Sequence, residues 1–464
     1  MIASAPQIPP DTRAAHRQLS PAAERFLEHL LDHPDQAAQL EGFNKEMPDW
    51  MAPVHLTWPT LVDARRVAEM ERATAGVCRL VKAIPAVVFG GDLNAIGAFY
   101  GYDPAVLELL FLVPNHMNST VARCDFIDTP GGLMCCEVNM AGNLGGWEHA
   151  FWREHYLRHP VIMDFCAREG ISPGGHDVLL TFCEHMIDDA LDSGVIRAGG
   201  ELNVMVALDE PPTEGARRHA AEVYAELLRR TGRGVTGQLW LSAEPAKELT
   251  FRGVDLYRGE RRVHVFFAYD TKPFPRHLLR AQLAGGIRVY NGGLARMWLD
   301  KRNLALLSEN EGLEAWKEED RELIRDHIPW TRLVSSSTTT WRGAEVQFPG
   351  FLLDHRDDMV LKRGLGAEGH GVHVGRYLAP DAWEARVREA VEEGGWIVQE
   401  WVESRPYFYP FQPGAAPVPH TVIWGLFCTG WRYGGCWLRM LPQGTGEGVV
   451  NSARGACEGA ILEI

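Results

Sequence analysis

Two short polar motifs in the first third of the chain constrain its fold most. The first contains Arg123 and Asp125, and after eleven further residues the second begins with Glu137 and ends with Asn139. Side chains alternate along a strand, so each pair would share one face. The surrounding residues predict two strands joined by a turn rich in Pro and Gly: Val121–Ile127 and Leu133–Met140. Four polar groups would then meet on one patch of a β-hairpin.

The residue types in this hairpin suit a magnesium ion and a phosphoryl group. Asp125, Glu137 and Asn139 offer hard oxygen ligands, which Mg²⁺ prefers. The guanidinium of Arg123 matches an oxyanion with two parallel hydrogen bonds. An exposed hairpin with an internal salt bridge would explain the same residues, so the motifs alone leave both interpretations open.

A glycine-rich loop follows a short apolar strand later in the chain. The strand, Met359–Lys362, ends in a lysine, and the segment 363–372 contains four glycines. Glycines let backbone N–H groups approach phosphate oxygens, and the lysine adds positive charge. The loop is not a Walker A motif, because no Gly-Lys-Ser/Thr follows, nor does its spacing fit a dinucleotide fingerprint. A merely flexible turn is the alternative.

Two further segments complete a candidate nucleotide site. The apolar run 396–403 predicts a buried strand whose polar end offers backbone groups to an adenine and Glu403 to a ribose. The segment 299–307 predicts a helix with Lys301 near its start. An ordinary core strand and a solvated helix face are the alternative interpretations.

In this order, the four motifs resemble the ATP-grasp superfamily in its circularly permuted form, in particular the synthetase domain of glutathionylspermidine synthase. The stretch 366–369 is similar to that family's Gly-x-Glu-Gly loop, and 399–401 to its Gln-Glu-aromatic hinge. Ordinary ATP-grasp chains carry the metal motif last, whereas here it comes first. The resemblance extends over roughly residues 50–455.

The resemblance implies a role for each matched residue. Asp125 and Glu137 would hold one Mg²⁺, Glu137 and Asn139 a second, and Arg123 would stabilise the phosphoryl group in flight. The 364–371 loop would close over the β and γ phosphates of ATP. The residues implied to bind the nucleotide are Lys301, Lys362, Gly366, Glu368, Gly369, His370, Gly371, Val372, Gln399, Glu400, Trp401, Val402 and Glu403.

Two arginines near the end of the sequence are further catalytic candidates. Arg439 lies in a predicted strand, Cys436–Leu441, where relatives carry an arginine near the acyl-phosphate. Arg454 lies in the stretch 451–455, which resembles the closing Asn-Ser/Thr segment of the family. Either would anchor a phosphate or a substrate carboxylate. A surface salt bridge is the alternative for each.

Composition limits the class of partner. The 464 residues are 46% hydrophobic, enough for a large core and more than one lobe. Lys and Arg total 46 against 61 Asp and Glu, a formal net charge of −15. This balance argues against nucleic acid and anionic membranes as partners. No apolar run is long enough for a transmembrane helix, and we see no secretory signal.

The nine scattered cysteines lack zinc-type spacing, so reduced thiols in a cytoplasmic enzyme are the simplest expectation.

The predicted fold class is α/β (α+β), an ATP-grasp fold in permuted order with a helical N-terminal region and a βα subdomain. The predicted regions are a leader and helix (1–50), a helical region with the metal hairpin (51–200), a βα and hairpin subdomain (201–290) and a nucleotide lobe (291–464). The expected elements between the motifs are helices Pro21–Leu40, Leu61–Lys82, Pro104–Leu112 and Glu214–Thr231, strands Leu202–Leu208, Glu248–Tyr257, Val263–Tyr269 and Thr421–Leu426, and a linker Val334–Thr340.

The sequence therefore predicts an ADP-forming ligase. It would use Mg-ATP to convert a carboxylate into an acyl-phosphate, which an amine attacks to give an amide. The resemblance implies amino-acid, peptide or polyamine-like substrates, and leaves the oligomeric state open. A kinase that releases a phosphorylated small molecule, or a non-catalytic nucleotide-binding protein, would use the same motifs.

Overall fold

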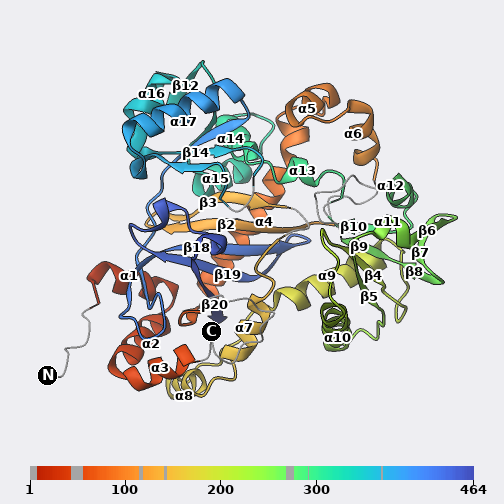
Figure 1. Cartoon of the computed structure of the whole chain (residues 1–464), viewed down its shortest axis with the longest axis horizontal. Helices are drawn as coiled ribbons and strands as arrows, with labels where there is room; N and C mark the ends of the chain where they lie inside the picture. Colours follow the sequence, from red (N-terminus) through yellow and green to blue (C-terminus); the bar gives the residue numbers. More distant parts are fainter. Residues whose placement is uncertain are drawn as a thin grey trace.

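The structure is a computed structural model that describes residues 8–42, 56–113, 119–140, 144–267, 276–290, 292–366 and 369–464. It is a mixed α/β fold in which helices and two further sheets with their neighbouring elements surround a central sheet (Figure 1). The predicted mixed α/β class is confirmed. The four predicted region boundaries stay a prediction.

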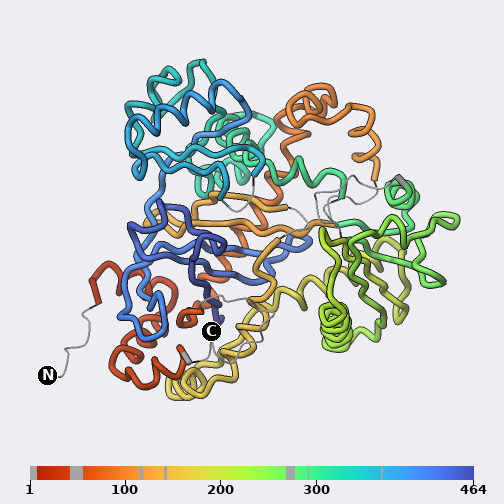
Figure 2. The backbone as a smooth tube through the Cα atoms, in the orientation of Figure 1, coloured from red at the N-terminus to blue at the C-terminus, as the bar shows by residue number. Residues whose placement is uncertain are grey.

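The central sheet combines strands from both halves of the chain. Its order is β1-β20-β19-β18-β2-β3, with β17 paired to β18, and only the β1–β20 pair is parallel. In Figure 2 the early strands β2 and β3 lie beside the late strands. In the register of β2 with β18, Phe126 lies opposite Trp424. The strands are β1 (Thr60–Val62), β2 (Val121–Thr129), β3 (Gly132–Asn139), β17 (Tyr407–Tyr409), β18 (Val418–Thr429), β19 (Arg432–Pro442) and β20 (Cys457–Glu463).

Helix α4 (Ala64–Val87) covers one face of this sheet and leaves the other face for the candidate site. The hydroxyl of Thr74 on α4 donates to the carbonyl of Leu426 at 3.3 Å, and Arg66 forms a 2.9 Å ion pair with Asp128. Cys124 and Phe126 are fully buried on the same side. Because side chains alternate along β2, the motif residues point to the opposite face.

A second, antiparallel sheet lies over that opposite face, at the upper left of Figure 1. Its order is β11-β16-β14-β15, and a hydrophobic cluster that includes Trp383 and Trp396 packs against it. Its elements and neighbours are β11 (Thr331–Leu333), β14 (Met359–Arg363), β15 (Val372–Val374), β16 (Trp396–Glu400), the hairpin β12 (Thr338–Trp341) and β13 (Ala344–Gln347), and helices α14 (Arg302–Glu309), α16 (Gly350–Asp354) and α17 (Pro380–Glu393).

A parallel sheet of order β10-β9-β4-β5 forms the lobe at the right of Figure 1. Two hydrophobic clusters, one of which includes Tyr224 of α10, pack against this sheet. The lobe contains β4 (Val204–Ala207), β5 (Leu239–Ser242), β9 (Val265–Phe267), β10 (Arg288–Tyr290), the three-stranded unit β6 (Leu249–Arg252), β7 (Asp255–Arg258) and β8 (Arg261–Val263), and helices α10 (Glu214–Arg230), α11 (Pro245–Glu248) and α12 (Arg276–Leu283).

The remaining helices surround these sheets. Helix α1 contacts β17, where His16 accepts a hydrogen bond from the backbone of Phe408 at 3.0 Å. The helices are α1 (Pro10–Leu19), α2 (Pro21–Asp32), α3 (Pro34–Gly42), α5 (Leu93–Tyr100), α6 (Pro104–Phe111), α7 (His149–Tyr156), α8 (Pro160–Glu169), α9 (Val178–Asp192), α13 (Ala295–Trp298) and α15 (Glu318–His327), with short 3₁₀ turns at Arg356–Asp358, Gly375–Tyr377, Gly446–Gly448 and Ser452–Arg454. No helix in the described part of the chain is long and apolar enough to cross a membrane.

Three predicted helical boundaries near the N-terminus were wrong. The predicted helix 21–40 is two helices, because Pro34 lacks an N–H and starts α3 after His33. Part of the predicted leader is helix α1. The predicted helix from Leu61 begins only at Ala64, since Thr60–Val62 forms β1 and Asp63 caps α4 by accepting from a backbone N–H.

Three predicted strand or loop assignments were also wrong. The run 248–257 contains two strands, because Gly253 turns the chain with a φ of 64°. The run from Val263 is divided between β8 and β9, and Tyr269 at its predicted end lies outside the described residues. The predicted linker 334–340 contains the start of β12, where threonines favour a strand.

Candidate functional site

An open cavity lies between the central sheet and the second sheet. Both sheets contribute to its walls, so it collects residues that are far apart in sequence, from Asp125 to Asn451. Its lining residues are Asp125, Ile127, Cys136, Glu137, Lys301, Val360, Lys362, Gly369, Val372, Val374, Gln399, Glu400, Trp401, Val402, Ile423, Arg439, Gly448, Val449, Val450 and Asn451.

The predicted metal hairpin forms one wall of the cavity. Asp125 lies directly opposite Glu137 in the β2–β3 ladder, and Arg123 lies opposite Asn139. The register shifts beside Asp125, so β3 carries one extra residue there, Cys136. This bulge places Glu137 on the cavity face although Cys135, two residues earlier, is fully buried opposite Phe126.

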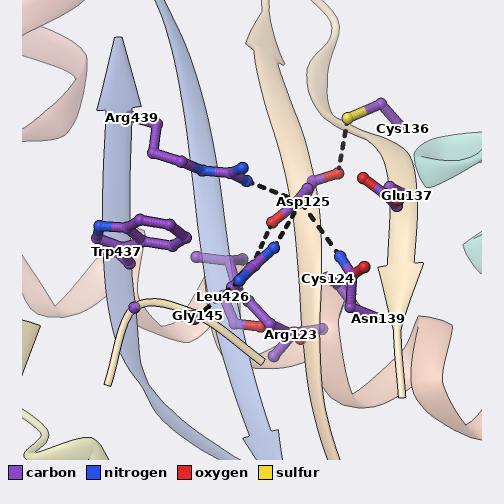
Figure 3. A network of polar contacts seen from close by, with 12 residues as sticks. Arg123, Cys124, Asp125, Cys136, Glu137, Asn139, Gly145, Leu426, Trp437 and Arg439 are labelled. Atoms are coloured by element: carbon purple, nitrogen blue, oxygen red, sulfur yellow. Dashed lines mark hydrogen bonds and ion pairs between the residues drawn. The ribbon is translucent and has the colours of Figure 1, made fainter. Parts of the chain in front are cut away.

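Asp125 is the centre of a polar network (Figure 3). Arg123 donates to both of its carboxylate oxygens, at 2.8 Å and 3.1 Å, and Arg439 forms an ion pair with it at 2.7 Å. The amide of Asn139 donates to it at 3.2 Å. Burial opposes ionisation of Asp125, but the charges of Arg123 and Arg439 outweigh burial and lower its pKa to about 2.

Trp437 on β19 is a platform for both arginines. Its ring centroid lies 4.9 Å from the guanidinium carbon of Arg123 and 4.5 Å from that of Arg439. Figure 3 shows the backbone of Gly145 beside this network, where its carbonyl accepts from Arg123 at 2.8 Å. Gly146 follows with a φ of 94°, and a Cβ there would lie 2.5 Å from the indole ring. The loop therefore packs directly against Trp437.

Lys301 joins the metal hairpin to the glycine-rich loop. It lies at the start of α14, where its ammonium group forms a 2.8 Å ion pair with Glu137 and donates to the carbonyl of Gly366 at 2.7 Å. The Lys301 side chain is buried, whereas that of Glu137 is 28% exposed towards the cavity. The ammonium group of Lys301 is therefore paired with Glu137, the carboxylate that the sequence predicts to be a metal ligand.

Lys362 joins the two sheets across the cavity. Its ammonium group donates to the carbonyl of Cys136 on β3 at 2.9 Å and to the side-chain oxygen of Gln399 on β16 at 2.6 Å. Burial lowers the pKa of Lys362. Gln399 in turn donates to the hydroxyl of Thr331 at 3.1 Å, so its side chain positions Lys362 rather than extending into the cavity.

The glycine-rich loop begins above the cavity. Gly369 and Gly371 have φ angles of 73° and 71°, a conformation that other residues adopt at a cost. The exposed Arg454 donates to the carbonyl of Gly369 at 3.2 Å. Gly369 and Val372 line the cavity, whereas Gly366, His370 and Gly371 lie beside it in the loop. Glu368 lies outside the described residues.

The predicted adenine hinge lies at the end of β16. Glu400, Trp401 and Val402 line the cavity, and the backbone N–H of Trp401 already donates to the carbonyl of Asp358 at 2.8 Å. Glu403 lies further out, with a side chain 66% exposed and paired with Arg376 at 3.2 Å. The structure therefore brings the hinge backbone to the cavity but not the carboxylate of Glu403.

Several site residues carry no motif signal. Trp437 was not predicted, although its position two residues before Arg439 on one strand places both side chains on one face. The apolar wall near the hinge, formed mainly by valines of β14 and β15, reads in the sequence as ordinary strand core. The stretch 448–451 lines the cavity between Arg439 and Arg454, and only the closing Asn-Ser resemblance pointed to it.

The described residues include no group of three or more His, Cys, Asp or Glu side chains arranged to hold a metal. The candidate set contains only two carboxylates and an amide, Asp125, Glu137 and Asn139, so any metal here would need further oxygen from a substrate.

The neighbouring thiols do not suit nucleophilic chemistry. Burial raises the pKa of Cys136 to about 12 and that of Cys135 well above its usual range.

Comparisons with known proteins define the fold more than the chemistry. No protein-family model matches the sequence, and no curated protein is significantly similar to it. Among solved structures, the fold is similar to the glutathione synthetase-like class. One such structure is a glutathione synthetase-like effector from Globodera pallida in its apo form, with a TM-score of 0.52, 11% sequence identity and coverage of 88% of this chain and 90% of that one. At this identity the likeness concerns the fold alone.

Proposed function

We propose that this protein is an ATP-dependent carboxylate–amine ligase with an ATP-grasp architecture in circularly permuted order. It would activate a carboxylate as an acyl-phosphate and release ADP and phosphate. The observation that carries the proposal is the cavity between the central sheet and the second sheet, where lysines, an arginine and oxygen ligands from distant segments converge. The permuted order is supported by the metal hairpin, which precedes both lysines in the chain yet pairs with β18.

The cavity offers matching environments to the parts of ATP. The valines of β14 and β15 and the hinge backbone provide an apolar slot for adenine. Lys301 and Lys362 line the same cavity, where their ammonium groups would contact the phosphates. Gly369 and Arg454 lie above, so closure of the loop would cover the phosphates and exclude water.

Oxygen ligands on the metal hairpin fit Mg²⁺. Asp125 is ionised, and Glu137 extends from the neighbouring strand into the cavity. Asp125 and Glu137 would hold one ion, and Glu137 with the side-chain oxygen of Asn139 would hold a second. When bound, Mg²⁺ would neutralise the β and γ phosphates. Because Lys301 pairs with Glu137, its ammonium group would have to release this carboxylate for Glu137 to hold a metal, and it would then be free to contact a phosphate.

Arg123 and Arg439 would stabilise the transferred phosphoryl group. Both guanidinium groups are held by Asp125 below and by the face of Trp437, so they are oriented before substrate binds. Preorganised donors of this kind contribute to catalysis because they need not reorganise as charge develops. No protein nucleophile is required, since ATP supplies the leaving-group activation.

A screen of Mg²⁺-dependent ATP turnover tests the proposal. Amino acids, short peptides and polyamines are added singly and in pairs, with hydroxylamine as a surrogate amine. ADP released only with a carboxylate, together with a trapped hydroxamate, would support the ligase and identify the acid. AMP would contradict phosphoryl transfer to the carboxylate. ADP with a stable phosphorylated product would identify a kinase, and nucleotide binding without turnover would favour a non-catalytic role.

Variants link any turnover to the site. Glu137→Ala is expected to abolish ATP turnover, because this carboxylate would serve both metal ions. Lys362→Ala is expected to weaken ATP binding by removing a charge-assisted contact. Lys317→Ala is the matched control, since Lys317 is exposed on the surface. Turnover near that of the wild type in Glu137→Ala would contradict the metal assignment. The carboxylate and amine partners stay predictions, as does the cytoplasmic location.

A further inference from the structure

Strand β5 forms an open edge of the parallel sheet. It is the last strand in the order β10-β9-β4-β5, and among the described strands it pairs only with β4. The carbonyls of Gln238, just before β5, and of Ser242, at its end, each accept a 2.8 Å backbone hydrogen bond from the β4 segment. Carbonyl directions alternate along a strand, so the backbone groups of Leu239 and Leu241 point away from β4. They present donors and acceptors along the open edge.

An open groove lies along this edge, between β5 and helix α10. The helix contributes Glu214, Arg217, Arg218 and Ala221 to the wall of the groove. These residues are three or four positions apart, so they share one face of the helix. Two guanidinium groups therefore lie beside the unpaired edge.

The side chains of β5 line the groove from both faces of the sheet. Leu239 packs against the hydrophobic cluster that includes Tyr224 of α10, and Leu241 shares its face by alternation. Trp240 points to the opposite face, where the guanidinium carbon of Arg258 on β7 lies 5.4 Å from its ring centroid. A strand added along β5 would thus meet arginines on both of its faces.

The groove carries an excess of positive charge in an acidic chain. Its described lining contains three arginines and one acid, Glu214, although the chain has a formal net charge of −15. Arg217 approaches Glu214 only to 3.8 Å, and both side chains are exposed, so solvent screens this pair. Arg258 pairs with Glu248 at 2.8 Å. Arg218 forms no ion pair with any described residue. This arrangement favours an anionic occupant.

We propose that β5 and the arginine-lined groove beside it form a docking site for an acidic peptide, which adds to the parallel sheet as a further strand. Hydrogen bonds to the backbone of Leu239 and Leu241 would supply affinity. Arg217, Arg218 and Arg258 would select carboxylates on the peptide. The described linings of this groove and of the nucleotide cavity share no residue, so the inference goes beyond the proposed ligase and does not depend on it.

A second copy of the chain fits this edge less well than an acidic peptide. Antiparallel pairing of β5 with its copy would bring the arginines of one groove beside those of the other. Like charges on neighbouring strands oppose such pairing. An acidic partner offers the opposite charge at the same positions.

Binding of a fluorescently labelled (Glu-Val)₃ peptide to the full chain, followed by anisotropy, tests the site. The controls are a (Lys-Val)₃ peptide and a (Glu-Val)₃ peptide N-methylated at every residue, which keeps the charge but cannot donate backbone hydrogen bonds. We expect the unmodified acidic peptide to bind about tenfold or more tightly than either control. Its affinity should fall as salt is raised. Absence of binding, or equal binding of either control, would overturn the inference.

Arg218→Glu is expected to weaken binding of the acidic peptide about tenfold, because it replaces an attraction by a repulsion. Arg229→Glu is the matched control: Arg229 is an exposed arginine of α10 outside the groove, and its replacement changes the net charge equally. Thermal unfolding checks that both variants are folded. Full affinity in Arg218→Glu, or an equal loss in both variants, would overturn the inference.

Hydrogen exchange locates the bound peptide. We expect the acidic peptide to slow amide exchange in β5 and to leave β10, at the opposite edge of the same sheet, unchanged. Unchanged exchange in β5 would contradict strand addition. Sedimentation of the chain without peptide tests the other occupant. A dimer whose β5 amides are already protected would assign this edge to a second copy and would overturn the peptide site.

Discussion

The ion pair between Lys301 and Glu137 leads to a prediction about metal binding. Because the ammonium group lies 2.8 Å from the carboxylate, it competes with a metal ion for the same oxygen. We expect Lys301→Met to bind Mn²⁺ without nucleotide on the order of tenfold more tightly than the wild type, as one lost competing ion pair would allow. Paramagnetic resonance measures the free Mn²⁺.

The control is Lys317→Met, which removes an exposed lysine at the start of α15. Its Mn²⁺ affinity should equal that of the wild type. Lys301→Met should also bind ATP more weakly, because the ammonium group would otherwise move to a phosphate. Unchanged Mn²⁺ affinity in Lys301→Met would mean that Glu137 is not a metal ligand.

Glu458 should make the folded protein less stable at high pH. Burial raises its pKa from an ordinary 4.5 to about 7, so between these values the folded chain binds a proton that the unfolded chain has lost. Stability therefore falls as pH rises through this window, and the full cost, about 3 kcal/mol, is present above it. We expect Glu458→Gln to be more stable than the wild type above pH 7 and equally stable below pH 4.5.

Chemical unfolding followed at both extremes of pH measures this difference. Glu392→Gln should match the wild type at both, because that carboxylate is exposed. A Glu458→Gln protein that is less stable than the wild type at high pH would contradict this prediction. It would indicate that the ionised carboxylate stabilises the fold.

At this scale, the sequence predicted residues whose role is local. The spacing of Arg123, Asp125, Glu137 and Asn139 within one hairpin was enough to place them together. The contact between Trp437 and Glu458 was not predictable, because it depends on the register between β19 and β20. A single Trp or Glu within an apolar strand does not show which residue lies opposite it. The assignment of each residue to a ligand stays a prediction.

Strand β18 carries a glycine where the side chain of Arg123 crosses it. Gly425 lies between Asp125 and Trp437 in the sheet. A Cβ there would lie 3.0 Å from the side chain of Arg123, 3.1 Å from the carbonyl of Trp437 and 3.3 Å from a carboxylate oxygen of Asp125. We expect Gly425→Ala to displace Arg123 and lower turnover by about tenfold or more, with ATP affinity retained.

Gly434→Ala on the adjacent strand is the matched control. A Cβ at Gly434 would meet its neighbours at 3.4 Å or more, an ordinary contact distance. Steady-state ATP turnover and thermal unfolding compare the two variants. If both lose the same activity, general strain in the sheet rather than the position of Arg123 explains the effect.

Element prediction succeeded where one local signal dominated and failed where tertiary contacts decided. The metal hairpin and the strand at 359–362 follow from alternation and a turn. The 263–269 run contains one apolar stretch, but its residues belong to two sheets because β9 pairs in parallel with β4. No period within the run marks that division. The Pro34 break, in contrast, was readable from the sequence.

The whole molecule would respond to nucleotide as one unit, because the cavity has walls in two sheets. We expect Mg-ATP to slow backbone hydrogen exchange in β14 and β16 of the second sheet and also in β3 and β19 of the central sheet. Strand β5 of the parallel sheet is the internal control and should not change. Protection of only one of the two sheets would contradict a nucleotide held between them.

At the scale of the whole molecule, the sequence predicted the mixed α/β class, and the permuted order of the motifs stays a prediction. Their separation in sequence says nothing about which sheets they join, and the pairing of β2 with β18 emerges only in the folded structure. The parallel lobe had no motif at all. Its strands read as ordinary buried runs, so its place beside the central sheet was not predictable.

The pairing of β2 with β18 has a consequence for biosynthesis. The β2–β3 hairpin emerges early, but the strand that completes its outer edge follows only after the second and third sheets have been made. Until then the outer edge of β2 has unpaired backbone N–H and C=O groups, with which another strand can pair incorrectly. Such long-range closure is slow. We therefore expect production of this protein in soluble form to depend on chaperones that shield a nascent sheet.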